Sequence, residues 1–175
     1  MNDPSLHTAY CESPVGLLEI QYNDNGVHAI LFVNAWKGPK LDTGQIEIIP
    51  PDNETVKTCI TQLQEYFEGK RKDFDFSFSQ EGTAFQLKVW NALLDIPYGK
   101  TISYMELSKR IGDTKAIRAV GTTNGRNQLS IVVPCHRVIG ANGNLVGYGG
   151  ELWRKKWLLD HEAKYANGVQ TLGEW

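Results

Sequence analysis

The amino-acid sequence predicts an α+β protein, with a small N-terminal α+β domain over residues 1–80 and a mainly helical C-terminal domain over residues 81–175. Three observations lead to this prediction. β-rich runs fill the first third of the chain, helix-capping signals gather after Gly82, and two short helical patterns meet at Gly112. With 175 residues, the chain is long enough to bury a hydrophobic core without disulfides.

The N-terminal domain is expected to begin with strands. Residues 15–22 and 27–33 are rich in β-forming side chains, and Asn23-Asp-Asn-Gly26 between them is typical of a hairpin turn. Residues 7–12 can add a third strand. Together these runs predict an antiparallel sheet.

A loop, a helix and a further strand complete this domain. Residues 34–52 are rich in Gly, Pro and Asp and predict a loop, with a short strand at Ile46–Ile49. Asn53 is expected to cap a helix that runs to about Phe67, because apolar side chains recur there at helical spacing. Phenylalanines alternate with polar residues over Asp73–Ser79, and this period of two predicts a strand.

Helix-start signals open the C-terminal domain. Thr83-Ala-Phe-Gln86 and Ser103-Tyr-Met-Glu106 both fit the capping box, in which two side chains close on the free backbone amides of the first turn. The second box is expected to begin a helix that ends near Ile111. The last helix is expected over residues 151–165, with an apolar inner side. The inner side chains are Leu152, Trp157 and Leu158.

The two short helices around Gly112 indicate a helix-turn-helix, which we take as the winged kind. Asp113 or Thr114 is expected to cap its second helix, from Lys115 to about Thr123. One face of that helix lacks bulk, which suits either the approach of a DNA groove or phosphate backbone, or close packing of another helix. The small residues on this face are Ala116, Ala119 and Gly121. The basic residues nearby, which favour DNA, are Lys109, Arg110, Lys115, Arg118 and Arg126.

Charge separates along the chain. Residues 1–80 carry 12 acidic and 6 basic side chains, a net charge of −6. Residues 81–175 carry 8 acidic and 12 basic side chains, a net charge of +4, so the whole chain has −2. If the protein binds a polyanion, the C-terminal half is where it would bind; the alternative is a chance imbalance of charge.

The cysteines and the hydropathy pattern exclude several classes of protein. Cys11, Cys59 and Cys135 are odd in number and widely spaced, which argues against a disulfide framework or a zinc ribbon and favours a reducing cytoplasm. No apolar run is long enough to span a membrane, and the N-terminal residues do not resemble a secretory signal.

One cysteine lies in a context that suggests reactivity. Pro134-Cys135-His136-Arg137-Val138 follows Ile131-Val-Val133, an apolar run expected to bring Cys135 from the core to an edge. A cysteine becomes a good nucleophile when its surroundings favour the thiolate, and His136, Arg137 or nearby helix N-termini can do this. Neighbouring side chains on a strand point to opposite faces. Cys135 and His136 can therefore serve one site only through a turn or a bridging water.

A set of motifs spans Gly82–His161: Ile96-Pro-Tyr-Gly99, Ser103-Tyr104, Arg118-Ala-Val-Gly121, Asn124-Gly-Arg-Asn127, Pro134-Cys-His-Arg-Val-Ile139, Gly147-Tyr-Gly-Gly150 and Lys156-Trp-Leu-Leu159. In this order they resemble the O6-alkylguanine–DNA alkyltransferases, also called methylated-DNA–protein-cysteine methyltransferases. Residues 1–80 are similar to that family only in general layout. The resemblance implies direct-reversal DNA repair. An alkyl group, such as methyl, would pass from O6-alkylguanine in DNA to Cys135, irreversibly and once per molecule, and O4-alkylthymine is a second candidate substrate.

The resemblance also implies roles for the residues that react. Cys135 is the alkyl acceptor, His136 is a general base that works through a water, and Glu162 orients His136. Asn127 ties the helix-turn-helix to the active-site segment. Tyr104 protonates the departing guanine, because anionic guanine is a poor leaving group.

Further residues would bind the substrate. Arg118 enters the base stack where the target nucleotide is flipped out. Val138 and Tyr148 form walls of the guanine pocket, and the backbone amide of Gly149 meets the O6 atom. The helix-turn-helix is expected in the minor groove of double-stranded DNA, where small side chains permit close approach. Its DNA-binding residues are Ala116, Ala119, Gly121, Lys115 and Arg126.

Other polar residues are expected outside this chemistry. Arg137 is expected to pair with a carboxylate or a carbonyl beneath the site. Lys155 and Lys156 are expected to lie on a solvated helix face, and contact with phosphate is the alternative. No metal is expected in the N-terminal domain, since its histidines and remaining cysteines do not form a recognisable ligand set. Those residues are His7, Cys11, His28 and Cys59.

We expect a cytoplasmic monomer that needs no cofactor, and two other classes of function compete with alkyl transfer. One is a non-enzymatic binder of damaged DNA or a regulator that uses the helix-turn-helix, although the cysteine at position 135 argues against this class. The other is a cysteine hydrolase built on Cys135 and His136, which would leave the helix-turn-helix unexplained.

Overall fold

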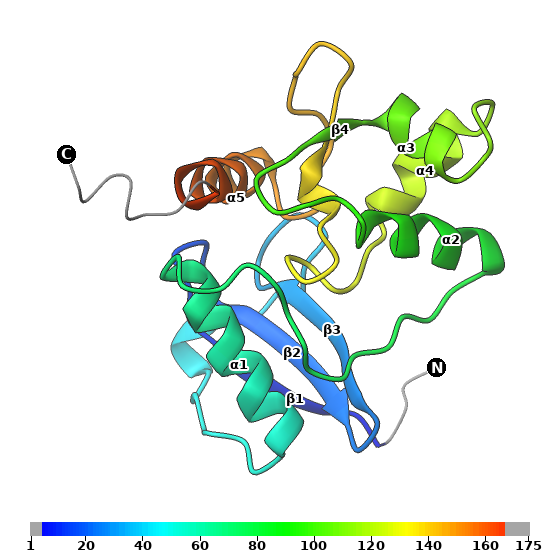
Figure 1. Cartoon of the computed structure of the whole chain (residues 1–175). Coiled ribbons are helices and arrows are strands. Elements are labelled where there is room, and N and C mark those ends of the chain that lie inside the picture. Colours follow the sequence, from blue (N-terminus) through cyan, green and yellow to red (C-terminus); the bar gives the residue numbers. More distant parts are fainter. Residues whose placement is uncertain (1–4, 167–175) are drawn as a thin grey trace. The chain divides into compact units, whose positions relative to one another are not determined.

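Two compact units make up residues 5–166, the part of the chain that the computed structural model describes. The first unit contains the described residues up to Gln80 together with Gln128–Ser130. The second contains Glu81–Asn127 and the described residues from Ile131 onward. Figure 1 shows the sheet within the first unit and most of the helices within the second.

An antiparallel sheet in the order β1-β2-β3 forms the first unit, as predicted. Its strands are β1 (His7–Cys11), β2 (Leu18–Asn23) and β3 (Gly26–Phe32). The hairpin turn needs Gly26, whose φ is 127° and where a Cβ atom would come within 2.6 Å of the Ser77 carbonyl oxygen. Far along the sequence, Leu129 forms a parallel bridge with Ile30, which explains why residues 128–130 belong to this unit.

Helix α1 (Glu54–Phe67) packs against β3 and carries the predicted cap. The Asn53 side chain accepts a hydrogen bond from the Val56 amide, which satisfies one of the free amides of the first turn. The apolar stripe of α1 is buried, and its members are Val56, Cys59, Leu63 and Tyr66. The helix prediction is confirmed at both ends.

Two strand predictions for the first unit are wrong. Ile46–Ile49 is not a strand; Thr43–Gln45 form a 3₁₀ turn instead, and Pro50-Pro51 have no amide hydrogens to donate to a ladder. Asp73–Ser79 forms only one bridge, between Phe78 and Val27. The Asp75 amide donates instead to the Gln62 side chain of α1, at 3.1 Å.

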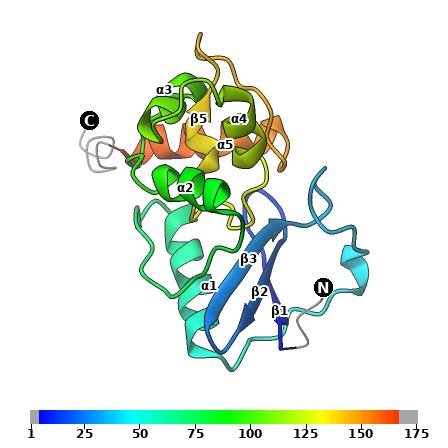
Figure 2. The same ribbon diagram turned by 90° about the vertical axis from the view of Figure 1, so that its right-hand side faces the viewer.

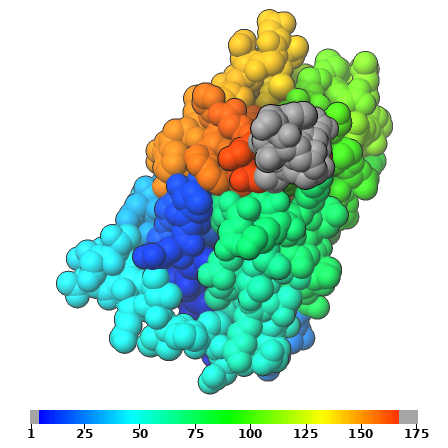
Figure 3. Space-filling view, turned by 60° about the vertical axis from the view of Figure 1, so that its left-hand side comes forward, coloured from blue at the N-terminus to red at the C-terminus, as the bar shows by residue number. Residues whose placement is uncertain are grey.

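An open groove of about 580 Å³ lies on the surface of the first unit, between the end of β1, the loop of residues 48–51 and one side of α1. Figure 3 shows these segments, in blue, cyan and green, at the surface of this unit. Most of its lining is apolar, and Ile48 and Ile49 are exposed there.

The second unit holds five helical segments and a short parallel strand pair (Figure 2). They are α2 (Ala84–Leu93), β4 (Ile102–Ser103), α3 (Tyr104–Arg110), α4 (Ile117–Asn124), the 3₁₀ helix η2 (Cys135–Arg137), β5 (Val138–Ile139) and α5 (Leu152–Tyr165). Helices α3 and α4 contact each other and form the predicted helix-turn-helix. The α+β fold class is therefore confirmed.

The helix starts follow the capping predictions in part. Thr83 and Gln86 form the complete capping box of α2. Ser103 caps α3 by accepting from the Glu106 amide, while the Glu106 carboxylate pairs with Arg110 at 3.3 Å. The predicted side-chain cap of α4 is wrong.

The start of α4 differs from the prediction because Asp113 accepts hydrogen bonds in the turn before the helix and does not cap the helix itself. Its carboxylate accepts from the Lys115 amide at 3.2 Å, and its carbonyl accepts from the Ala116 amide. This tight turn delays the helix, so that α4 begins at Ile117 with Ala116 as an N-cap that offers no side-chain acceptor.

No helix among residues 5–166 is both long and apolar enough to cross a membrane. In α5, Leu158 is fully buried and Trp157 is half-buried, as predicted for its inner side. Leu152, predicted for the same side, is the first residue of the helix and is 47% exposed instead.

Candidate active site

Cys135 lies at the start of a single 3₁₀ turn in the second unit. The apolar run before it does not continue as a strand toward an edge, as the sequence suggested. Ile131 has a φ of 75°, which turns the chain, and residues 131–138 are all buried. Cys135 is 5% exposed, and the turn replaces the strand geometry that would send Cys135 and His136 to opposite faces.

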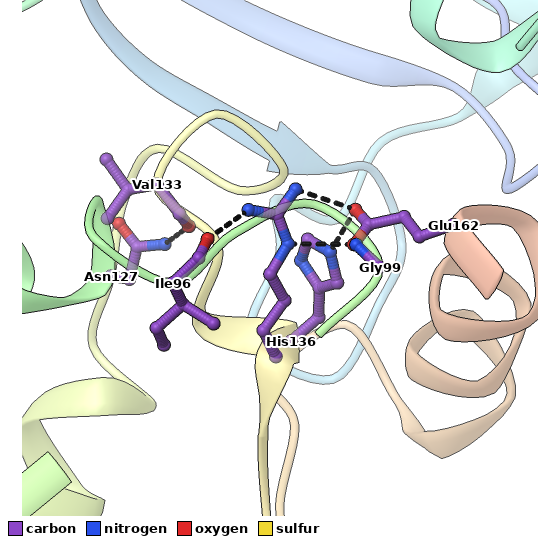
Figure 4. A network of polar contacts seen from close by, with 7 residues as sticks. Ile96, Gly99, Asn127, Val133, His136 and Glu162 are labelled. Atoms are coloured by element: carbon purple, nitrogen blue, oxygen red, sulfur yellow. Dashed lines mark hydrogen bonds and ion pairs between the residues drawn. The ribbon is translucent and has the colours of Figure 1, made fainter. Parts of the chain in front are cut away.

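His136 and Glu162 form a buried pair. The His136 Nε2 and Glu162 Oε2 atoms are 2.7 Å apart, and both side chains are almost completely buried (Figure 4). Because a carboxylate can only accept, Nε2 carries the hydrogen and Nδ1 of the neutral ring carries a lone pair. Nδ1 is buried and has no hydrogen-bond partner among the residues that the structure describes. The predicted carboxylate behind the histidine is present.

Arg137 completes this network from the neighbouring position. Its Nε and Nη2 atoms donate to the two Glu162 oxygens at 2.7 and 3.1 Å, and Nη1 donates to the Ile96 carbonyl at 2.7 Å. The Gly99 amide also approaches Glu162 Oε1, at 3.4 Å. Burial raises the pKa of Glu162, but the adjacent His136 and Arg137 outweigh burial and hold that pKa far below its ordinary value. Glu162 is therefore a fixed anion.

Asn127 holds the segment that contains the cysteine. Its Nδ2 atom donates to the Val133 carbonyl at 2.7 Å and lies 3.2 Å from the Cys135 sulfur (Figure 4 shows the first of these bonds). Both contacts fit an amide that fixes the loop and stabilises negative charge on the sulfur.

The surroundings of Cys135 shift the pKa of its thiol in opposite directions. Burial raises the pKa of its thiol, whereas the hydrogen bond from Asn127 and the positive charge of Lys155 lower it. The Tyr148 hydroxyl interacts with the sulfur as well and lowers that pKa further. The sulfur thus has three groups around it that favour the thiolate once it forms.

Lys155 lies inside this site and not on a solvated helix face, so that prediction is wrong. Its side chain is fully buried, and Nζ donates to the Val138 carbonyl at 2.6 Å and to the Val146 carbonyl at 3.0 Å. Burial lowers the pKa of Lys155 to about 8, and the nearby Cys135 opposes that shift. Lys156 is exposed, as predicted, and pairs with Asp160.

The remaining predicted pocket residues gather around these groups. Tyr104 is the first residue of α3, and its hydroxyl donates to the Val146 carbonyl at 3.4 Å. Val138 is fully buried in β5, and Tyr148 is buried in the loop before α5. Gly149 follows Tyr148 in that loop. Lys155 and Tyr104 therefore both bind the carbonyl of Val146, in the loop that carries Tyr148.

The predicted DNA-binding residues lie on or beside the helix-turn-helix. Lys115, Arg118, Ala119 and Arg126 are exposed, and Ala116 is half-buried at the start of α4. Gly121 differs from them, because a Cβ atom at this position would lie 3.8 Å from the Tyr104 ring. This is an ordinary van der Waals distance, so packing against Tyr104 does not by itself require glycine at position 121.

Sequence reasoning placed Lys155 wrongly and assigned no role to Asn124. Lys155 has a signal that could have revealed it, since Lys155, Leu158 and Glu162 follow one another at helical spacing on one face of α5. Asn124, buried at the end of α4, donates to the Cys135 carbonyl at 3.2 Å. Its only signal in the sequence is its position in the motif Asn124-Gly-Arg-Asn127.

The chemistry that this arrangement supports is attack by the Cys135 sulfur on an electrophilic carbon.

Among residues 5–166, no group of three or more His, Cys, Asp or Glu side chains could hold a metal ion. His28 bonds through its two ring nitrogens to Asn23 and Ser79.

Comparison with known proteins places these residues in context. Residues 6–80 match the family described as the ribonuclease-like domain of 6-O-methylguanine DNA methyltransferase, and residues 84–164 match the DNA-binding domain of the same enzyme. A methylated-DNA–protein-cysteine methyltransferase from Methanosarcina acetivorans is 45% identical over 162 residues, which cover 90% of this chain and 98% of the relative.

Solved structures agree. The O6-methylguanine methyltransferase of Mycobacterium tuberculosis has a TM-score of 0.79 at 39% identity, with 95% of this chain and 98% of that chain covered. A second structure, of the M. tuberculosis OGT in complex with DNA, has a TM-score of 0.79 at 38% identity and covers 91% of this chain and 94% of that chain.

Proposed function

Because this chain belongs to the 6-O-methylguanine DNA methyltransferase family, we propose that it repairs DNA by moving the alkyl group of O6-alkylguanine to Cys135. The observation that carries this assignment is the buried chain Cys135–His136–Glu162, in which the 2.7 Å bond to Glu162 leaves Nδ1 of the histidine as a base. A methyl group is the reference substrate, and O4-alkylthymine is a second candidate.

The proposed transfer is one displacement. His136 Nδ1 takes the thiol proton through a bridging water, and the Cys135 sulfur attacks the alkyl carbon. The sulfur–carbon bond forms while the carbon–O6 bond breaks, and the electron pair of the broken bond passes to the guanine. A thioether does not exchange with cellular thiols, so each molecule acts once.

Tyr104 is proposed as the proton donor to the guanine. Burial raises the pKa of Tyr104, so its hydroxyl keeps its proton until a strong acceptor arrives. The developing negative charge on the guanine is such an acceptor. The proton left on His136 balances the proton that Tyr104 gives up.

DNA is proposed to bind along the helix-turn-helix. Lys115, Arg118 and Arg126 expose their charges on or next to α4, where they can meet phosphates, and Arg118 is proposed to fill the stack when the base flips out. Val138, Tyr148 and the Gly149 amide then line the guanine pocket. The small Ala116 and Ala119, together with Gly121, let α4 approach the minor groove.

The proposed step uses groups of this chain, the substrate and one bridging water. The described thiols, Cys11, Cys59 and Cys135, are all free, which fits a reducing cytoplasm as the place of action. We propose that the protein acts as a monomer on duplex DNA, because the groups named for the chemistry all belong to one unit of one chain.

Intact-protein mass spectrometry with an oligonucleotide that contains O6-methylguanine tests this function. The wild-type protein should gain the mass of one methylation, and peptide mapping should place it on Cys135. Cys135→Ala should gain nothing, while Cys11→Ala, which removes another buried thiol, should still be methylated. Repair of more than one equivalent of DNA per protein would contradict a single-use acceptor.

A further inference from the structure

Asn124 is a buried amide that the proposed mechanism does not use. It is the last residue of α4 and is 2% exposed. Its Nδ2 atom donates to the Cys135 carbonyl at 3.2 Å. Its Oδ1 atom is buried and has no hydrogen-bond partner among the residues that the structure describes. An unpaired buried oxygen destabilises the folded state, so an asparagine at this position needs a compensating role for its amide nitrogen.

Tyr104 lies on the same face of α4 as Asn124. A Cβ atom at Gly121 would lie 3.8 and 3.9 Å from the Cδ1 and Cε1 atoms of the Tyr104 ring, so the ring covers this part of the helix. Gly121 and Asn124 are three residues apart and therefore share a face. The bond from the Tyr104 hydroxyl to the Val146 carbonyl is long, at 3.4 Å, so this hydroxyl is not held firmly there.

The interaction between the two side chains also has an electrostatic signature. Burial raises the pKa of Tyr104, the nearby Cys135 raises it further, and a side-chain hydrogen bond with Asn124 lowers it. A hydrogen bond that lowers the pKa of a phenol is one that the phenol oxygen accepts, so its donor is the amide nitrogen of Asn124. Asn124 thus counteracts the effect of burial on the group that has to release a proton.

We propose that Asn124 is the positioning residue that couples the two ends of the reaction: one N–H of its amide donates to the carbonyl of Cys135, and the other donates to the oxygen of the Tyr104 hydroxyl. The inference rests on the proposed roles of Cys135 and Tyr104. Asn124 itself does not touch the substrate. It keeps the proton donor at a fixed distance from the nucleophile, so that bond breaking and proton delivery coincide.

Two reactions of Cys135 separate this role from a structural one. Transfer from O6-methylguanine in DNA needs a proton donor, whereas alkylation by iodoacetamide does not, because iodide leaves without a proton. Asn124→Leu, which keeps the branching at Cγ and removes both polar atoms, should slow single-turnover methyl transfer by about tenfold or more. Its rate with iodoacetamide should stay within about twofold of wild type. Equal slowing of both reactions would overturn the proposal.

A double-mutant cycle tests the path through Tyr104. Tyr104→Phe alone should slow methyl transfer, and adding Asn124→Leu should slow it little further, because the hydroxyl that Asn124 directs is already gone. Two independent, multiplying effects would refute the coupling. If Tyr104→Phe transfers at the wild-type rate, the proposal fails as well, since Asn124 would have no proton donor to position.

Controls keep the outcomes distinct. Asn91→Leu, at an exposed position of α2, should match wild type in both reactions. Asn124→Ser, which is too short to reach both partners, replaces Asn124→Leu if the latter fails to fold, and the same split between the two reactions is expected. Wild-type protein that gains no methyl group would refute the proposed function itself, whereas a wild type that is methylated beside an unaffected Asn124→Leu would refute only this inference.

Discussion

Glu162 carries a charge in a place where two neighbours, and not water, compensate it. Its side chain is 1% exposed and binds His136 and Arg137 at 2.7 Å each. Without Arg137 the carboxylate would be strongly disfavoured in the interior. Arg137 therefore stabilises the fold and also keeps Glu162 charged behind the proposed general base, His136.

Glu162→Gln should lower both stability and activity. The variant keeps the shape but leaves the Arg137 charge buried without its counter-charge, which should reduce the free energy of unfolding by about 3 kcal/mol or more. Methyl transfer should fall by about 100-fold, since His136 loses the anion that orients it. Urea denaturation and single-turnover assays measure the two effects. As a matched control, Glu106→Gln, in an exposed pair with Arg110, should cost less than about 1 kcal/mol; equal losses would contradict the assigned burial.

Acid should destabilise the protein through the same carboxyl. The pKa of Glu162 is depressed in the folded state below its ordinary 4.5. Its stabilising contribution is therefore complete above about pH 4.5 and is lost as the pH falls from there toward the depressed value. The free energy of unfolding, measured between pH 6 and pH 3, should drop more steeply for wild type than for Glu162→Gln. Parallel curves would show that Glu162 is not the group that titrates.

Single residues also show where the sequence was informative. Asn127 contacts Cys135, and His136 contacts Glu162, in the pairs that the family resemblance implies. Lys155 was misplaced, because a lysine is almost always solvated and only its partners, two backbone carbonyls, make its burial possible. Every residue has a backbone carbonyl, so the sequence does not show which carbonyls will accept hydrogen bonds from a buried lysine.

At the scale of elements, caps and helices were predicted well and short extended segments poorly. The signals at Asn53 and Thr83 are local and act through nearby amides. The segment Asp73–Ser79 has strand periodicity, but a strand also needs a partner, and the Asp75 amide is taken by Gln62. Likewise, α4 starts late because Asp113 serves the preceding turn. Such competition between partners depends on tertiary contacts.

The start of α5 contains a local strain that one substitution can release. Glu151 has φ 75° and ψ 150°, a region that only glycine enters freely. Glu151→Gly should therefore raise the free energy of unfolding by about 1 kcal/mol, after allowing for the greater freedom of glycine in the unfolded chain. The lost contact with Arg154, at 3.8 Å, contributes little. Thermal denaturation measures the change, and Glu151→Ala is the control, because it removes the same contact and should bring no gain. A less stable Glu151→Gly would indicate that the carboxylate matters more than the backbone.

For the whole molecule, the distribution of charge matters more than its sum. The net charge of −2 combines −6 in residues 1–80 with +4 in residues 81–175. The total charge therefore does not indicate DNA binding. The exposed Lys115, Arg118 and Arg126 lie on the positive part of the chain. Attraction to phosphates acts over about 10 Å at moderate salt, so local charge decides where DNA binds.

The salt dependence of DNA binding should distinguish the two halves. Each phosphate contact that is lost lowers the slope of log affinity against log salt concentration by about 0.9. Lys115→Gln should therefore weaken binding to any duplex at low salt and reduce the slope by about that amount. Lys57→Gln, which removes a charge from α1 in the first unit, should change neither. Fluorescence anisotropy with an undamaged duplex, titrated at several salt concentrations, measures both quantities. Equal effects of the two variants would mean that total charge governs binding, and the helix-turn-helix would then lose its proposed role in holding DNA.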